Sequence, residues 1–157
     1  MIEAVLYCDA SVKAGFCGIG LCLLDLNGNL IKKQSRRLSD RGKNNTEGEA
    51  AAIIEGIKLA QKHGFSSIRI YTDSKSLVQV ANRGKGGTKM TRKFVKALST
   101  LKNLIAISIK WVKGHSGQKW NTLCDKLARN ASWSITDLIT IGFNRLCGNW
   151  DVPGALV

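Results

Sequence analysis

The sequence predicts an α/β fold in which a five-stranded mixed sheet carries helices on both of its faces. Three apolar strand patterns come first along the chain, and helical and strand patterns then alternate in the order βββαβα(α)βα. The 157 residues are 44% hydrophobic and include one proline, which is typical of a folded chain with a substantial core. With no internal repeat and no linker pattern, one globular unit is expected.

The first three strands are predicted over residues 3–10, 16–26 and 30–37, which are rich in Val, Leu, Ile and Cys. The tripeptide Asn-Gly-Asn at 27–29 separates the second strand from the third and is a strong hairpin signal. We therefore expect these three strands to be antiparallel neighbours.

Residues 44–64 have the chemistry of a helix, with Asn and Thr at the start, apolar residues on a 3.6-residue period, and Gly64 at the end. A strand is predicted next, at 66–74. Because a whole helix separates this strand from the first three, it is expected to run parallel to the first strand. The remaining pattern predicts helices at 74–82, 90–103 and 120–132 and a fifth strand at 104–114.

The composition favours nucleic acid as the partner. Lys and Arg total 24 against 11 Asp and Glu, a formal net charge of +13, and this favours a polyanion over the alternatives of an anionic membrane surface or simple solubility. Five cysteines form an odd count without a C-x-x-C pair, which indicates a reducing compartment. With no leader pattern and no membrane-spanning stretch in the sequence, a soluble cytoplasmic protein without membrane contact is expected.

Two aspartates end predicted strands. Asp9 follows the apolar run of the first strand, and Asp73 follows that of the fourth. A single carboxylate at a strand end is ordinarily a turn former or a helix cap. If the two strands are adjacent and parallel, however, both carboxylates reach the same sheet edge, where they repel each other unless a divalent cation lies between them. The pair therefore predicts a metal site.

Two helices offer further acids. Glu49 lies on the stripe of the 44–64 helix that faces the sheet, although Glu47 and Glu49 are also favourable charges for a first helical turn. In the last helix Asp125 follows Asn121 by one turn on the same face. Four carboxylates are the hard oxygen ligands that suit Mg²⁺.

Four segments resemble the active-site segments of type 1 ribonuclease H, in the same order and on the same predicted elements. They read YCDAS, NTEGEAAAIIEGIKLA, YTDSKSL and WVKGHSGQKWNTLCDKLARNA. The resemblance covers roughly residues 3–131. It implies a ribonuclease H-like fold with a catalytic domain over 1–131, followed by a C-terminal extension over 132–157. That extension is expected to dock on the same domain, the alternative being contact with a second chain.

The resemblance also implies an activity and its residues. Members of the family cut the RNA strand of RNA/DNA hybrids with two divalent ions, so two Mg²⁺ are expected here, with Mn²⁺ as a substitute, in a monomeric endonuclease. Matched position by position, Asp9, Glu49 rather than Glu47, Asp73 and Asp125 become the metal ligands. His115, which outside the motif KGHSG would be a bystander, becomes the residue that assists proton transfer or product departure.

Substrate contacts are expected beside these acids. Asn45 and Asn121 match family positions that touch the substrate, and the backbone at Ala10 and Ser11 and the Ser74 hydroxyl are expected to join them. Hybrid selectivity requires groups that read 2′-hydroxyls, since only RNA offers that donor and acceptor.

The sequence departs from the family pattern in two places. Ala10 stands where family members usually carry glycine, and the segment from Asp73 to Trp111 is short for the basic protrusion that some members use as a substrate handle. Trp120 is the best-placed aromatic platform. Basic residues are expected to replace the handle, unless they form only a solvated helix face: Lys85, Lys89, Arg92 and Lys93, together with Arg83 and Lys96.

Two rival functions remain at this point. A DNA-cutting relative on the same fold shares the acidic cluster, but is not expected to carry the GHSG…N…CD arrangement. A binding module for hybrid or double-stranded RNA is expected to have lost acids, whereas all four are present here.

Overall fold

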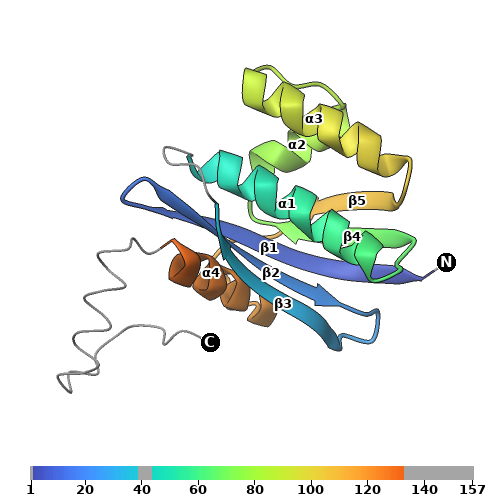
Figure 1. The fold of residues 1–157 in the computed structure, drawn as a ribbon, viewed down its shortest axis with the longest axis horizontal. Helices are drawn as coiled ribbons and strands as arrows, with labels where there is room; N and C mark the ends of the chain where they lie inside the picture. The colour runs from blue at the N-terminus through green and yellow to red at the C-terminus, as the bar shows by residue number, and fades with distance from the viewer. Residues whose placement is uncertain (1, 39–43, 133–157) are drawn as a thin grey trace.

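The computed structural model describes residues 2–38 and 44–132. Five strands form one sheet in the order β3-β2-β1-β4-β5 (Figure 1). β1 pairs antiparallel with β2 and β2 with β3, whereas β4 runs parallel to β1, as predicted. β5 runs parallel to β4, a pairing that the sequence did not specify. The strands are β1 (Glu3–Lys13), β2 (Phe16–Leu24), β3 (Leu30–Arg37), β4 (Ser67–Thr72) and β5 (Ala106–Trp111).

Four helices cover the two faces of the sheet. α1, α2 and α3 lie on one face, and α4 lies on the other (Figure 1). This arrangement confirms the expected α/β fold with a mixed sheet and helices on both faces. The helices are α1 (Asn45–Lys62), α2 (Lys75–Arg83), α3 (Lys89–Lys102) and α4 (Lys119–Ala131).

Two strand ends differ from the predicted ones for local reasons. β1 continues to Lys13 because Ala14 and Gly15 both take positive φ, 51° and 80°, and close a two-residue hairpin onto Phe16. β2 ends at Leu24 because the Asp25 carboxylate accepts hydrogen bonds from the backbone N–H groups two and four residues later, each 2.9 Å long, and turns the chain.

The main core lies between the sheet and α1. β1 is the central strand, and its residues Ala4, Leu6 and Cys8 are buried against this helix side. The stripe of α1 predicted to face the sheet is buried as expected and consists of Glu49, Ile53, Gly56 and Ala60. A glutamate within this stripe is the one charged side chain of the four, which points to a function for it.

A second packing contact sets the position of α4. A Cβ at Gly20 would overlap the carbonyl oxygen of Cys124, and a Cβ at Gly18 would overlap that of Ala128. The two glycines of β2 therefore let the backbone of α4 lie directly on the sheet. This close approach fixes the level of Asp125 relative to β1.

None of the helices within 2–38 and 44–132 is both long and apolar enough to cross a membrane. Residues 133–157 lie outside the described part of the chain, and so the expected docking of the C-terminal extension stays a prediction.

Candidate active site

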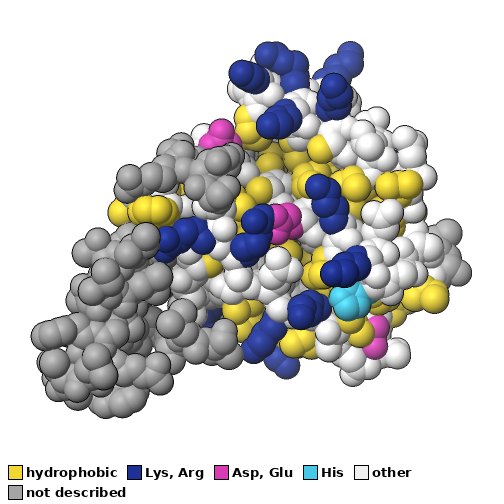
Figure 2. All heavy atoms as spheres, viewed as in Figure 1, with side chains coloured by type: hydrophobic (Ala, Val, Ile, Leu, Met, Phe, Trp, Pro, Cys, Tyr) yellow, Lys and Arg dark blue, Asp and Glu magenta, His cyan; other side chains and the backbone are white. Residues whose placement is uncertain are grey.

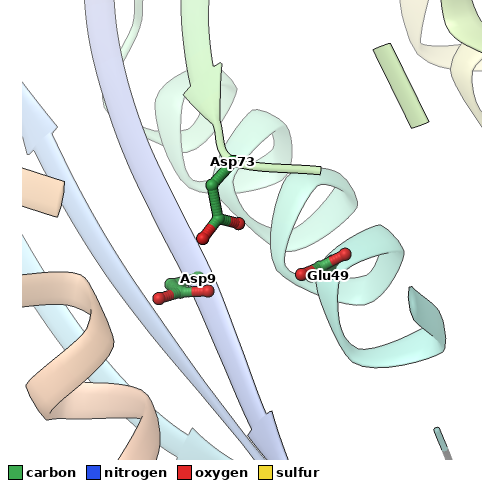
Figure 3. A group of neighbouring side chains, drawn as sticks. All are labelled: Asp9, Glu49 and Asp73. Carbon is green, nitrogen blue, oxygen red and sulfur yellow. The ribbon is translucent and has the colours of Figure 1, made fainter. Parts of the chain in front are cut away.

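Three carboxylates from three different elements converge at one edge of the sheet. The parallel register of β1 and β4 pairs Tyr7 with Tyr71, so that Asp9 and Asp73, each two residues further along, reach the same level. Glu49 approaches them from α1 (Figure 3). Their ligand oxygens lie within 4.8 Å of one another. The expected neighbourhood of Asp9 and Asp73 is therefore present.

The two glutamates at the start of α1 have separate surroundings. The carboxylate of Glu47 accepts the backbone N–H of Asn44 at 2.9 Å, while the Asn44 side chain accepts the N–H of Glu47, which makes a capping box. The carboxylate of Glu49 is turned inward, is 8% exposed, and accepts a 2.9 Å hydrogen bond from Nδ2 of Asn45. Only Glu49 is available to the acidic cluster.

The first turn of α1 lies close to β1 because of Gly48. A Cβ there would overlap Sγ of Cys17 and stand 2.9 Å from the Cβ of Ala10. The methyl group of Ala10 therefore faces α1 and is buried, while its backbone N–H donates to Oδ1 of Asp9 at 2.8 Å. The residue that departs from the family pattern thus still helps to hold the Asp9 carboxylate.

Burial and mutual repulsion make ionised acids costly here. Burial first, and then the charge of Asp73, raise the pKa of Asp9 to about 7. Burial also raises the pKa of Glu49, although a hydrogen bond from Ser74 opposes the change, and burial raises that of Asp73, against the charge of His115. Such acids stay charged at neutral pH at a cost that a bound cation removes.

The residues fit a divalent cation. Oδ1 of Asp73 is buried and has no hydrogen-bond partner within the described ranges. A buried oxygen of this kind needs a partner, and a bound cation would supply one. All the donors are carboxylate oxygens, the set that Mg²⁺ and Mn²⁺ prefer. Asp9, Glu49 and Asp73 would hold such an ion.

Asp125 faces the same site from α4 but is not one of the three clustered acids. It lines a cavity of about 270 Å³ together with Asp9 and Asp73. Its Oδ2 accepts a hydrogen bond from Nη2 of Arg129, one turn later, at 2.5 Å. Arg129 also lines the cavity, and the rest of the lining consists of His115, Gly117, Asn121 and Thr122.

His115 lies in a loop that is packed on Asp73. A Cβ at Gly114 would come within 2.7 Å of Oδ2 of Asp73, so only glycine lets the loop pass this close. His115 is exposed and has a φ of 53°, the left-handed region in which a non-glycine residue is strained. Backbone strain of this kind concentrates at functional sites, and His115 lines the same cavity as Asp9, Asp73 and Asp125.

The predicted substrate-contact residues divide into two groups. Asn121 lines the cavity, is 3% exposed, and has an Oδ1 with no hydrogen-bond partner in the part of the chain that the structure describes. Asn45 and Ser74 contact Glu49 instead, and Ser11 is partly buried on β1. The structure thus places the predicted polar contacts around the acids.

The basic residues lie away from the acid-lined cavity. Lys85 and Arg92 line a separate open groove of about 560 Å³ between α3 and the loop that connects α2 to α3, and Lys96 joins them there. Lys89 and Lys93 are exposed on α3 but do not line this groove. Figure 2 shows Lys and Arg side chains gathered over α3.

Sequence reasoning missed two side chains. Trp111 is 48% exposed, and its Nε1 donates a 3.1 Å hydrogen bond to the backbone carbonyl of Asp73. Arg129 pairs with Asp125. The only signal for Trp111 was its place in WVKGHSG, and for Arg129 the i,i+4 spacing. Trp120, the expected platform, is partly buried and packs against the cluster of Cys22 and Cys124.

Comparison with known proteins agrees with this geometry. The profile of the RNase H family matches residues 2–133. A ribonuclease H of Syntrophomonas wolfei is 35% identical over 104 residues, which are 58% of this chain and 70% of that protein. A ribonuclease HI of Campylobacter jejuni is 31% identical over 102 residues, which are 58% of this chain and 66% of that protein.

Solved structures share the fold. The N-terminal RNase H domain of a Mycobacterium tuberculosis protein superposes with a TM-score of 0.73 at 23% identity, covering 84% of this chain and 94% of that one. RNase H1 of Halobacterium salinarum gives a TM-score of 0.72 at 20% identity and covers 82% and 96%. The expected enzyme class and the resemblance to type 1 are confirmed by the family match and the names of these relatives. The chain belongs to the ribonuclease H family.

Proposed function

We propose that the protein is an endonuclease that hydrolyses the RNA strand of RNA/DNA hybrids, with two divalent cations held by Asp9, Glu49, Asp73 and Asp125. The observation that carries this proposal is the convergence of three carboxylates within 4.8 Å in a chain of net charge +13, with the fourth on the same cavity. A structural relative, LC11-RNase H1 (TM-score 0.68), has been solved in complex with an RNA/DNA hybrid, which supports the proposed substrate class.

Each acid has a distinct task in this proposal. Asp9 lies within the extended β1, four residues before its end, and not at a strand end as the sequence predicted, whereas Asp73 directly follows β4. Both present their carboxylates from rigid backbone, while Glu49 closes the site from α1. Bound cations would supply Lewis acidity, which lowers the pKa of an attacking water and stabilises a departing 3′ oxygen. The ions are proposed to be Mg²⁺, with Mn²⁺ as a substitute, since the donors are hard oxygens.

His115 is proposed to move a proton at the edge of the cavity or to assist product departure. Its exposed imidazole lines the cavity beside Asp73, and its ring is therefore within reach of both solvent and the site. The nitrogens of an imidazole can both accept and donate a proton, which suits this side chain to proton transfer.

The polar groups around the acids are proposed to read the RNA strand. Asn121 lines the cavity, and its Oδ1 is an acceptor with no hydrogen-bond partner among residues 2–38 and 44–132, which suits a 2′-hydroxyl donor. Asn45, the Ser74 hydroxyl and the backbone at Ala10 and Ser11 are proposed to contact the same strand, since each lies beside Asp9 or Glu49 in space or sequence.

The DNA strand is proposed to follow the basic surface of α3. Lys85 and Arg92 line the groove between α3 and the α2–α3 loop, and Nη1 of Arg92 donates a 3.1 Å hydrogen bond to the carbonyl of Gly87. Lys89 and Lys93 add charge on the exposed side of the same helix. Phosphate contacts of this kind hold and orient a duplex without reading its sequence.

The catalytic domain is proposed to span residues 1–131 and to act as a monomer in the cytoplasm. All four acids come from one chain and reach one site, so the active site needs no second copy. Cys8, Cys22 and Cys124 are buried thiols, which suits a reducing compartment.

One assay separates this proposal from its rivals. The protein is incubated with labelled RNA/DNA hybrid, duplex RNA and duplex DNA, each with Mg²⁺, with Mn²⁺ or with a chelator. We expect cleavage of the RNA strand of the hybrid with either ion and none with chelator. Cutting of duplex DNA would favour a DNA-cutting relative, and binding of hybrid without cleavage would favour a binding module.

A further inference from the structure

Asp125 differs from the other three acids in what its carboxylate contacts. Asp9, Glu49 and Asp73 face one another, with oxygens within 4.8 Å. Asp125 lines the same cavity, but its Oδ2 is bonded at 2.5 Å to the guanidinium of Arg129 on the next turn of α4. The side chain of Asp125 is 16% exposed and that of Arg129 is 63% exposed. The fourth acid is therefore already neutralised by a residue of its own helix.

Arg129 is not merely a surface partner, because its side chain also lines the acid-lined cavity. A cation that used Oδ2 of Asp125 would meet the guanidinium at the same oxygen. Arginine stays protonated at every accessible pH, so it cannot yield the oxygen by losing a proton. For a cation to bind Oδ2 of Asp125, the guanidinium of Arg129 has to move away from that oxygen, and the high solvent exposure of its side chain allows this.

We infer that Arg129 is a positioning residue that holds Asp125 in the metal-free protein and competes with a divalent cation for it. This inference rests on the proposed function only in taking the acidic cavity as a cation site. Arg129 then sets the cation concentration at which a cation binds on the Asp125 side of the site. Cation binding by the cluster of Asp9, Glu49 and Asp73 does not depend on Arg129.

The expected effect is modest. Ion pairs at i,i+4 with one exposed partner are weak, so removing the guanidinium should tighten cation binding at the Asp125 side by roughly two- to fivefold. Arg129→Gln removes the charge and keeps a side chain of moderate length. Lys126→Gln is the matched control, because it removes the same charge from an exposed position of the same helix.

The experiment measures cation binding without substrate. Mg²⁺, and Ca²⁺ as a second probe, are titrated into the full chain by calorimetry, and the rise in Tm with cation is recorded in parallel. The variants are Arg129→Gln, Arg129→Lys, Lys126→Gln, Asp125→Asn and the Asp125→Asn/Arg129→Gln double variant. Melting in chelator first establishes that each variant is folded.

We expect Arg129→Gln to bind the cation two- to fivefold more tightly, Arg129→Lys to resemble the parent, and Lys126→Gln to change it by less than Arg129→Gln does. In the Asp125→Asn background the Arg129 substitution should have no effect. An unchanged affinity in Arg129→Gln, or equal tightening in the Asp125→Asn background or in Lys126→Gln, would overturn the inference alone. A parent protein that binds neither cation would overturn the proposed function as well.

Discussion

Asp9 and Asp73 face each other across the parallel pair of β1 and β4, and their charges raise the cost of ionising Asp9 (Figure 3). Burial is the larger cause, and together the two effects bring the pKa of Asp9 to about 7. In the metal-free protein this carboxylate therefore destabilises the fold whenever it is charged. With a cation between the two acids, the charged carboxylates stabilise the fold instead.

Asp9→Asn should abolish cleavage while raising the stability of the metal-free protein. The substitution removes a buried charge and almost no volume, so the repulsion from Asp73 disappears and the core packing stays. Thermal melts in chelator and in Mg²⁺ check this. The parent should gain more stability from Mg²⁺ than the variant does. Turnover at the parental rate by Asp9→Asn would contradict the assignment of this ligand.

Metal-free stability should fall with rising pH through the titration of Asp9. The folded-state pKa of about 7 lies above the ordinary value of 3.8 for an aspartate, so the folded protein binds this proton more tightly than the unfolded chain does. The stability contributed by the protonated form is complete below about pH 4 and is lost as pH rises through 7. Because each pKa unit is worth about 1.4 kcal/mol, the loss is on the order of 4 kcal/mol.

Denaturant unfolding of the parent and of Asp9→Asn in chelator, from pH 4 to pH 8, isolates this contribution as a difference. The parent should lose stability relative to the variant across that range, and Mg²⁺ should flatten the difference. A constant difference would show that Asp9 titrates normally.

Glu49→Gln should eliminate activity, whereas Glu47→Gln should retain most of it. Glu49 faces the acids, but Glu47 accepts the N–H of Asn44 and only caps α1. The amide oxygen of Gln can still accept that N–H, so Glu47→Gln removes only a favourable charge from the first turn of α1 and should cost roughly 0.3 to 1 kcal/mol of stability. Cleavage rates and urea unfolding of both variants provide the comparison, and the reverse pattern would mean that the helix is read in the wrong register.

His115→Ala should lower turnover more than hybrid binding. The imidazole sits on the cavity edge, so its loss affects proton or product movement more than the ground-state complex. Single-turnover rates across pH and hybrid affinity are measured together, with His63→Ala at the exposed end of α1 as the control. An unchanged rate for His115→Ala at every pH would make it a bystander.

The basic groove should contribute to the salt dependence of binding. Each phosphate contact releases counterions and adds roughly 0.9 to the salt slope. The triple variant Lys85→Gln/Arg92→Gln/Lys96→Gln should flatten the slope by about two to three units, while single-turnover cleavage at saturating enzyme stays near the parental rate.

Lys89→Gln/Lys93→Gln is the comparison, because these side chains lie on the same helix outside the groove. Its salt slope should change by less than about one unit. Equal flattening per charge removed would mean that the whole face of α3 acts as a diffuse positive field rather than as a groove.

The fold could be predicted from the sequence because the sequence patterns for its elements are local and agree with one another. The Asn-Gly-Asn turn specifies one hairpin, and the intervening α1 requires β4 to run parallel to β1. The end of β1 could not be predicted, because its extension to Lys13 depends on Ala14 taking a positive φ, which alanine rarely does.

The acids of the site could be predicted from the sequence for a related reason. Strand ends and helix stripes specify which way Asp9, Asp73 and Glu49 point, and the motifs agree. Two contacts could not be predicted from the sequence, that of Trp111 with the Asp73 carbonyl and that of Arg129 with Asp125. Each depends on the orientation of one long side chain in three dimensions. Residue spacing alone does not specify such orientations.

The most direct test of the account is to locate Mn²⁺ by anomalous diffraction in crystals of the protein soaked with that ion. Two peaks are expected among the four acids, with Asp9, Glu49, Asp73 and Asp125 as the residues that would hold them. The same soak of Asp9→Asn crystals should lose at least one peak. Full occupancy at two sites in Asp9→Asn, or no peak among the four acids of the parent, would contradict it.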